Sequence, residues 1–425
     1  MKRFPLLLLL LVSTVCAGEK ASLHVEGIVK SNEPGWSQWR GAYRDGISDE
    51  TGLLQSWPEN GPKKLWSASE LGRGFSSPVL TKDRLYITGD VDGKLIIFCF
   101  DHRGKVIWKA SNGKPWTRNY KGARACCLLR GGLLYNMNGF GRVVCMKPDD
   151  GSEVWAVDLL ERFDGKRITW GHSECLMADG NRLIVAPGGR KGLVAALELK
   201  TGKTVWASES ISGETSSYTS PILFEYGGVR HIVTCSSRHA IGINADTGKL
   251  LWRQPRETRY KAISSTPTYC GNGRVFLASP DGRKSELMQL TVAGSAVRAR
   301  SMWQCDMNNL TGGSILLDGH LYGAGYRAGD GWFCIELNTG KTKFHNTDLH
   351  AGSMVYADGR LYCFSERGEM ALMEPTPGGF IQHGRFRLVG GGEKGVRDSW
   401  AHPVVFDGRM YLRYHDVLYC YNIRK

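Results

Sequence analysis

A turn followed by a bulky aromatic residue recurs along this chain at a nearly constant interval. Five copies read Gly-x-x-x-Trp or Gly-x-x-x-Phe, and they lie at residues 104–108, 151–155, 202–206, 248–252 and 340–344. In three divergent copies the aromatic position is held by Trp66, Trp303 and Phe386, and the eight aromatic residues lie 41 to 51 residues apart. A period of this length predicts a fold built from eight repeated units.

Each unit is predicted to contain four short antiparallel strands. Several copies open with Ser-Pro or a related dipeptide, as at 77–80, 220–223 and 402–405. A turn then leads into a second strand, as in Asp-Gly-Arg-Leu-Tyr at 358–362, and such pairs between β-rich runs are hairpin signals. One such unit cannot bury both of its faces, but a closed ring can. The sequence therefore predicts an all-β, eight-bladed β-propeller of four-stranded blades.

The two ends of the chain indicate how the ring closes. After Trp400 the chain supplies only three strands, the last at 418–421. A fourth is available at 63–67, and its pairing with the last blade would remove an exposed sheet edge. We expect this N-terminal strand to complete the last blade. Seven blades is the alternative, should one divergent copy not form a blade.

The chain is predicted to divide into three segments. Residues 1–17, a basic start followed by an apolar run, have the layout of a secretory signal peptide. Residues 18–61 form an N-terminal leader, and residues 62–425 form a single propeller domain. Cys16 is alternatively the acylated cysteine of a lipoprotein, although Val15 is bulky where such sites need a small residue. We expect an exported protein, periplasmic or secreted, with no transmembrane segment.

Charge and cysteine content narrow the expected partners and chemistry. The formal net charge of +14 favours an anionic partner. We expect an envelope protein or an anionic polymer rather than nucleic acid, and a monomeric protein. Of the twelve cysteines, several share a strand position with small residues, so most are predicted to be buried structural thiols. The equivalent positions are Cys145, Ala196, Gly242 and Cys334.

The units resemble a known repeat family. Asp246 to Trp252, Asp-Thr-Gly-Lys-Leu-Leu-Trp, resembles the signature of pyrroloquinoline-quinone-type repeats, and the similarity extends over roughly residues 62–425. These repeats occur in pyrroloquinoline-quinone-dependent dehydrogenases and in an outer-membrane assembly lipoprotein. Residues 36–41 resemble the leader of secreted propellers of this superfamily. The resemblance implies a quinoprotein alcohol dehydrogenase-like propeller, but it indicates packing rather than a cofactor.

In a propeller, the starts of the innermost strands gather around the axis on one face, which we call the channel face. Aromatic and cationic residues precede these starts, and together they could hold a planar anionic ligand by stacking and hydrogen bonding. Residues 109–124 carry five basic side chains and no acidic one. The candidate ligand-binding residues are Arg118, Arg124, Trp170, His172, Glu174, Tyr218, Lys261, His350, Trp400 and His402.

The resemblance also implies a possible cofactor. In the dehydrogenases a calcium ion, which takes about six to eight oxygen ligands, holds the quinone, and a carboxylate acts as general base. Glu174 and Asp398 are the acids near the channel-face openings, which is too few for both tasks. Some of these enzymes carry a vicinal disulfide over the quinone, and Cys126-Cys127 resembles that pair. The same two cysteines also occupy the position that other blades fill with Ser-Pro.

These observations predict a non-catalytic binding or scaffold module that engages a protein or an anionic ligand at the channel face. No metal or cofactor is expected, and no catalytic residue is assigned. The alternative is a quinoprotein oxidoreductase that uses pyrroloquinoline quinone and Ca²⁺ on an alcohol or a sugar. A third interpretation, a scaffold in envelope assembly, would be favoured by acylation of Cys16.

Overall fold

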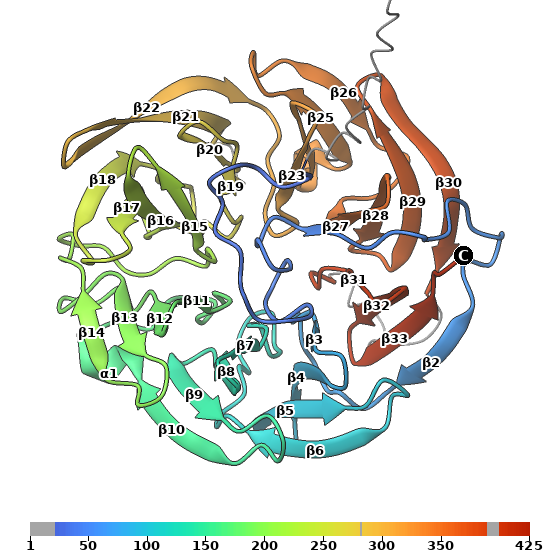
Figure 1. Cartoon of the computed structure of the whole chain (residues 1–425), viewed down its shortest axis with the longest axis horizontal. Coiled ribbons are helices and arrows are strands. Elements are labelled where there is room, and N and C mark those ends of the chain that lie inside the picture. The colour runs from blue at the N-terminus through green and yellow to red at the C-terminus, as the bar shows by residue number, and fades with distance from the viewer. Residues whose placement is uncertain (1–21, 281–282, 389–398) are drawn as a thin grey trace, which may run out of the picture.

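The computed structural model of the chain describes residues 22–280, 283–388 and 399–425. In this part of the chain, eight antiparallel sheets of four strands each stand as blades around a central axis (Figure 1). One of the sheets gains a fifth strand from the leader. The predicted eight-bladed propeller is confirmed, and the alternative of seven blades is wrong. The signal peptide predicted for residues 1–17 and the alternative lipidation at Cys16 lie outside the described residues.

Blades I to VIII follow the order of the chain, and the strands of each blade run from the innermost to the outermost. Blades I to IV consist of β3 (Val79–Leu80), β4 (Leu85–Val91), β5 (Lys94–Phe100) and β6 (Val106–Ser111); β7 (Leu128–Arg130), β8 (Leu133–Met137), β9 (Arg142–Met146) and β10 (Glu153–Asp158); β11 (Met177–Asp179), β12 (Arg182–Val185), β13 (Ala195–Glu198) and β14 (Thr204–Ala207); and β15 (Ile222–Tyr226), β16 (Val229–Cys235), β17 (His239–Asn244) and β18 (Leu250–Pro255).

Blades V to VIII are built in the same way. They consist of β19 (Thr268–Tyr269), β20 (Arg274–Leu277), β21 (Ser285–Ala293) and β22 (Ala296–Cys305); β23 (Ser314–Leu317), β24 (His320–Ala324), β25 (Trp332–Glu336) and β26 (Thr342–Asn346); β27 (Gly352–Ala357), β28 (Arg360–Ser365), β29 (Glu369–Thr376) and β30 (Gly379–Arg387); and β31 (Val404–Phe406), β32 (Arg409–Tyr414), β33 (Val417–Asn422) and β2 (Lys64–Ala68). The short helices are α1 (Leu159–Phe163) and η1 (Arg327–Gly329).

The ring closes as predicted, because β2 from the start of the chain pairs antiparallel with β33 near its end. Trp66 of β2 stands opposite Cys420 in this register. The outer edge of blade VIII is therefore covered by the chain's own N-terminal strand, which removes a free edge from the propeller.

The recurring aromatic residue holds neighbouring blades together. Trp155, on the outermost strand of blade II, donates its indole N–H to Leu199 O in blade III at 2.9 Å. The indole ring lies against Gly202 in the turn of that blade. In the four sheets for which a small residue was predicted opposite the aromatic residue, the register confirms that position. The register pairs are Trp155 with Cys145, Trp206 with Ala196, Trp252 with Gly242 and Phe344 with Cys334.

Gly202→Ala tests this contact between blades. Gly202 has φ +67°, and a Cβ there would lie 2.7 Å from a ring carbon of Trp155. Left-handed backbone at Ala costs about 1–2 kcal/mol, and overpacking adds about 1–3 kcal/mol. The expected loss of unfolding free energy is about 2–5 kcal/mol, measured by urea denaturation. Gly228→Ala is the matched control, because Gly228 has φ +72° and no described atom lies within 4 Å of a Cβ there. Equal losses in both variants would show that the ring contact contributes nothing.

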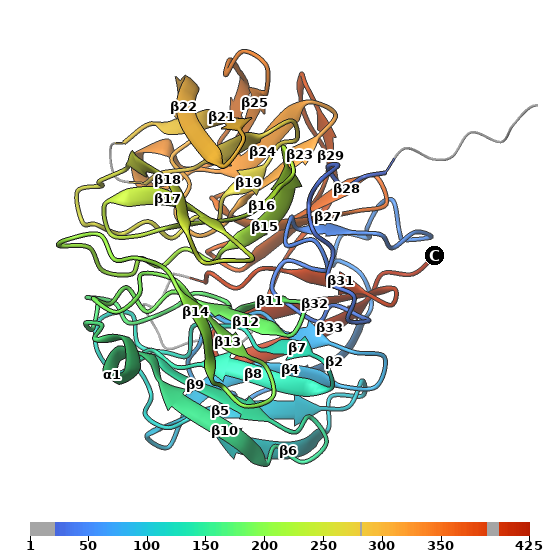
Figure 2. The ribbon, with the colours of Figure 1, turned by 60° about the vertical axis from the view of Figure 1, so that its left-hand side comes forward.

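The leader crosses the ring on the face opposite to the channel face. Its strand β1 (Ile47–Ser48) pairs in parallel with the end of β27 in blade VII. Trp36 O accepts a hydrogen bond from Leu80 N at the end of β3, and Gly27 O accepts one from Glu225 N in β15. In Figures 1 and 2 the blue leader passes over the middle of the ring and lies along one side of it. In the described residues, neither helix has the length and apolar character needed to cross a membrane.

Candidate functional site

A cavity of about 570 Å³ lies on the axis at the channel face. Its walls come from the segments that precede the innermost strands, so seven of the blades contribute to it. The lining is rich in aromatic side chains. The eight aromatic residues of the lining are Trp39, Phe75, Tyr120, Trp170, Tyr218, Tyr260, Tyr326 and Trp400.

Trp39 of the leader closes the bottom of this cavity. Its ring meets the ring of His402 edge-on at 5.1 Å, and the guanidinium of Arg44 lies 5.8 Å from its centroid. Arg44 is buried and donates hydrogen bonds to Pro221 O at 2.9 Å, Leu176 O at 3.0 Å and Cys175 O at 2.8 Å. These bonds anchor the leader to blades III and IV. The axial channel is therefore a blind cavity with an aromatic floor.

A row of hydrogen bonds between blades surrounds this floor. His402 N donates to Ser77 Oγ at 2.7 Å, and Ser77 N donates to Cys126 Sγ at 3.2 Å. Cys126 N donates to Cys175 Sγ at 3.4 Å, and Cys175 N donates to Ser220 Oγ at 2.9 Å. Each of these blades thus offers one side-chain acceptor to its neighbour. Cys126 and Cys175 occupy the position that serine holds in blades I and IV.

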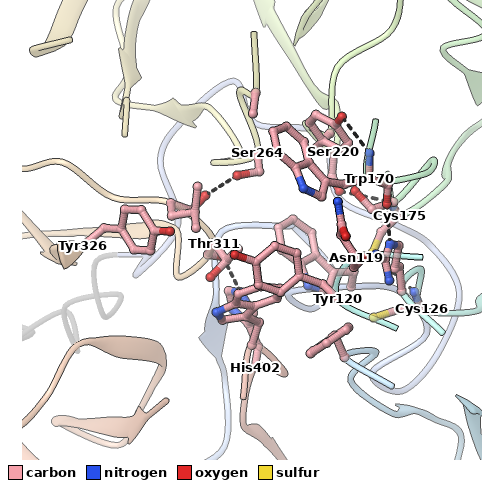
Figure 3. Close-up of a pocket in the computed structure, with 18 of the residues that line it drawn as sticks. Asn119, Tyr120, Cys126, Trp170, Cys175, Ser220, Ser264, Thr311, Tyr326 and His402 are labelled. Atoms are coloured by element: carbon pink, nitrogen blue, oxygen red, sulfur yellow. Dashed lines mark hydrogen bonds between the residues drawn. The ribbon is translucent and has the colours of Figure 1, made fainter. Parts of the chain in front are cut away.

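Six of the residues singled out from the sequence line the cavity. They are Arg124, Cys126, Trp170, Tyr218, Trp400 and His402. Arg124 donates to Trp170 O at 2.7 Å and to Gly122 O at 2.8 Å, so it organises two loops of the wall. Burial lowers the pKa of Arg124 to about 10, which leaves it cationic at neutral pH. Figure 3 shows Trp170 and His402 on different sides of the cavity.

Two polar atoms of the lining have no partner in the described part of the chain. These are Nε1 of Trp400 and Nδ1 of His402, and both are buried. His402 Nε2 lies 2.9 Å from Thr311 O and donates its proton to that carbonyl, so Nδ1 is left as an acceptor. Burial lowers the pKa of His402 to about 3, so the imidazole is neutral. Trp400 Nε1 and His402 Nδ1 are therefore a buried donor and a buried acceptor that no described group satisfies.

His172 and Glu174 lie beside the cavity rather than in its lining. Alternate residues of an extended segment point to opposite sides, and at this point of blade III it is Ser173 and Cys175 that belong to the lining. Glu174 is 3% exposed and accepts a hydrogen bond from Ala186 N at 2.8 Å. Burial raises its pKa to about 7, and burial lowers the pKa of His172 to about 4.

The remaining predicted residues also lie outside the lining. His350 Nδ1 lies 2.5 Å from the carboxylate of Asp330. Arg118 and Lys261 are exposed on the loops that contribute Tyr120 and Tyr260 to the wall. With the equally exposed Lys121 and Arg259 they form what we call the basic mouth, which is defined by Arg118, Lys121, Arg259 and Lys261.

Cys126 and Cys127 are free thiols in the structure, and the vicinal disulfide suggested by the resemblance stays a prediction. Cys126 lines the cavity, whereas Cys127 packs in an apolar cluster with Leu134 and Val144. The pair belongs to an extended segment, so its two side chains leave the backbone on opposite sides.

Several lining residues were not predicted from the sequence. Trp39 was placed only in the leader, and nothing local in the sequence says that this segment crosses the axis. Cys175 could have been found, because it lies 49 residues after Cys126 and 45 before Ser220. That spacing matches one repeat and marks Cys175 as the strand-opening residue of blade III.

The described lining does not fit a calcium-bound quinone. No Asp or Glu is among the described residues that line the cavity. Its side-chain oxygen atoms come from hydroxyl groups and from the amide of Asn119, whereas calcium sites in proteins use carboxylates among their ligands. Asp398, the other acid noted in the sequence, lies outside the described residues. The described residues also hold no cluster of three or more His, Cys, Asp or Glu suited to a metal ion.

Comparison with known proteins identifies related propellers. The family model described as outer membrane protein assembly factor BamB matches residues 93–346, more than half of the chain. The assembly factor BamB of Shewanella oneidensis is 25% identical over 262 residues, which cover 56% of this chain and 60% of that protein. The quinohemoprotein alcohol dehydrogenase ADH-IIG of Pseudomonas putida is 26% identical over 163 residues, 35% of this chain and 21% of that protein. The matches thus span less than two thirds of either relative.

A solved structure extends the likeness at the level of the fold. The quinohemoprotein alcohol dehydrogenase of Comamonas testosteroni superimposes with a TM-score of 0.61 at 11% identity, over 92% of this chain and 80% of that one. The shared feature is the ring of four-stranded blades.

Proposed function

This chain belongs to the family of the outer membrane protein assembly factor BamB, and from that membership we propose that it is a non-catalytic binding module for an acidic segment of an envelope protein. The segment binds in the cavity at the channel face. The observation that carries this proposal is the cavity itself, in which eight aromatic side chains surround about 570 Å³ next to a basic mouth. A volume of this size holds a few side chains rather than a folded domain.

The unpartnered atoms of the lining support a peptide as the ligand. A peptide group carries one C=O acceptor and one N–H donor. The indole N–H of Trp400 can donate to that carbonyl, and Nδ1 of His402 can accept from that N–H. The surrounding rings offer stacking and edge contacts to apolar or aromatic side chains of the segment. The two unpartnered atoms, Nε1 of Trp400 and Nδ1 of His402, would then both have a hydrogen-bond partner.

The charge of the mouth supports an acidic segment. Arg118, Lys121, Arg259 and Lys261 are exposed, and Lys261 pairs with Glu257 at 4.0 Å. Exposed charges of one sign attract an oppositely charged partner and raise its association rate, with an effect that salt weakens. The name of the family refers to an assembly factor of the outer membrane, and for this reason we place the partner in the envelope and this protein outside the cytoplasm.

Reversing the charge of the mouth is expected to weaken binding. The probe is a fluorescein-labelled peptide in which Asp and Glu alternate with Tyr, and its counterpart carries Lys in place of the acids. In Arg118→Glu/Lys261→Glu the Kd of the acidic peptide should rise about tenfold, since each exposed pair contributes up to about 1 kcal/mol. Fluorescence anisotropy at two salt concentrations measures this. Lys200→Glu, in an exposed turn of blade III, is the matched control and should leave the Kd unchanged.

Trp400→Phe tests whether the peptide occupies the cavity, because it keeps an aromatic ring and removes the N–H. We expect weaker binding of the acidic peptide in this variant. The proposal would be contradicted if the wild type bound the Lys-containing peptide as tightly as the acidic one. It would also be contradicted if Lys200→Glu weakened binding of the acidic peptide as much as Arg118→Glu/Lys261→Glu does. If an acidic polysaccharide such as polygalacturonate binds in the cavity and the peptide does not, the partner is an anionic polymer and not a protein segment.

The alternative function is a quinoprotein oxidoreductase acting on an alcohol or a sugar, which the similarity to the dehydrogenase of Pseudomonas putida favours. The described lining lacks the carboxylates that calcium uses, so we derive no catalytic step through the quinone. Titration of the protein with pyrroloquinoline quinone and Ca²⁺ by calorimetry and absorbance decides the matter. Saturable one-to-one binding followed by alcohol or sugar oxidation with an artificial electron acceptor would overturn the binding-module proposal.

A further inference from the structure

Two cysteines from neighbouring blades meet at the floor of the cavity. Cys126 precedes β7 in blade II, and Cys175 precedes β11 in blade III, 49 residues further along the chain. The backbone N–H of Cys126 donates to Cys175 Sγ at 3.4 Å, so the two cysteines are in direct contact. Both residues line the cavity, as Figure 3 shows.

The surroundings make the two thiols chemically unequal. Burial opposes ionisation of both. For Cys126, burial and the neighbouring Cys175 raise the pKa well above its ordinary value. For Cys175, hydrogen bonds from the side chain and the backbone of Cys126, together with the charge of Arg44, outweigh burial and hold the pKa below its ordinary value. Cys175 is therefore the better nucleophile of the pair, since the thiolate is the reactive form.

We propose that Cys126 and Cys175 form a disulfide between blades II and III when a small disulfide oxidant enters the cavity. This inference goes beyond the proposed function and does not depend on the identity of the partner. The Cys175 thiolate attacks one sulfur of the oxidant, whose S–S bond breaks, and the released thiolate takes up a proton. The Cys126 thiol then loses its proton and attacks the Cys175 sulfur, which breaks the mixed disulfide and releases the second sulfur of the oxidant as a thiolate that takes up a proton. The protein loses two electrons, and the oxidant is reduced to two thiols.

Position distinguishes this pair from the other cysteines. The described residues contain eleven free cysteines, and among them Cys126 and Cys175 are the two that line the cavity. The Cys175 sulfur lies 3.4 Å from the backbone nitrogen of Cys126, so the two side chains stem from neighbouring positions on adjacent blades, as a disulfide requires. Serine stands at the same position in blades I and IV, so replacing either cysteine with serine preserves the row of hydrogen bonds.

Peptide mapping of the folded full-length protein tests the proposal. The protein is treated with oxidised glutathione, its free thiols are alkylated, and a tryptic digest is analysed by mass spectrometry. Trypsin places Cys126 and Cys127 in the peptide 125–130 and Cys175 in the peptide 168–182. We expect these two peptides to be linked, with one alkylated cysteine remaining in 125–130 and with reversal by dithiothreitol. At limiting iodoacetamide, Cys175 should react at least about tenfold faster than Cys127.

Three serine variants assign the bond. Cys126→Ser and Cys175→Ser should abolish the link, whereas Cys127→Ser, the matched control, should retain it. An internal bond within 125–130, glutathione retained on Cys175 without a link, or full alkylation of both cysteines would each overturn the proposal. Mapping of the wild-type chain decides between these outcomes even if a variant fails to fold.

Discussion

Arg44→Met is expected to be strongly destabilising and to open the floor of the cavity. Arg44 donates to three backbone carbonyls of blades III and IV, at Pro221, Leu176 and Cys175. Its guanidinium is fully buried, and burial lowers its pKa to about 10, so it remains charged. Each buried carbonyl that loses its donor lowers the stability by about 1–3 kcal/mol. Part of this loss is offset, because the variant no longer has to remove a charged arginine side chain from water when it folds. We expect the free energy of unfolding to fall by about 3–5 kcal/mol, as measured by urea denaturation.

Loss of Arg44 also has a local consequence, because this residue lies against Trp39. The leader should become sensitive to limited proteolysis before the blades do. Lys30→Met is the matched control, since Lys30 lies in the same leader but is exposed. A leader that is cleaved no faster in Arg44→Met than in Lys30→Met would contradict the role assigned to the buried guanidinium.

Glu174→Gln is expected to stabilise the protein at alkaline pH and to have little effect at acid pH. Burial raises the pKa of Glu174 from 4.5 to about 7, so the folded protein binds this proton more tightly than the unfolded chain. The resulting stability is present at low pH and is lost as the pH rises from about 4.5 to about 7. Glutamine stays neutral, and its carbonyl can still accept from Ala186 N. At pH 8 the free energy of unfolding of the variant should therefore be about 2–3 kcal/mol higher than that of the wild type.

The measurement is urea denaturation at about pH 5 and about pH 8, on either side of the raised pKa. The difference between variant and wild type should fall below about 1 kcal/mol at the lower pH, which lies close to the pKa of 4.5 of the unfolded chain. Glu209→Gln is the matched control, because Glu209 is exposed. An advantage of Glu174→Gln that is equal at both values of pH would show that ionisation of Glu174 does not govern the effect.

The number of blades, their four strands and the closure by residues 63–67 were predictable because their signals are local and repeated. In several blades the aromatic residue packs on the turn glycine of the next blade, as Trp155 does on Gly202. Equal units impose equal spacing, so the aromatic residues could be counted along the chain. The small residue opposite several of them, such as Cys145 opposite Trp155, follows from the same register.

The candidate site was predictable only in part. The segments that reach the channel face were identified, and Arg124, Trp170, Tyr218, Trp400 and His402 lie in the lining. In blade III, His172 and Glu174 lie outside the lining, and Ser173 and Cys175 belong to it. Gly171 precedes them with φ +76°, and a residue in this conformation changes the direction of an extended segment. Such a change cannot be derived from composition or spacing.

The repeat alone therefore determined the ring, because each blade is specified by its own strands and by contacts to its neighbours. Only the tertiary structure decided that the leader crosses the axis, that Trp39 closes the channel into a cavity, and that Cys126 meets Cys175. These contacts join segments that are distant along the chain and that carry no repeated pattern. Their geometry arises when the ring closes, and the cavity in which the proposed partner binds arises with it.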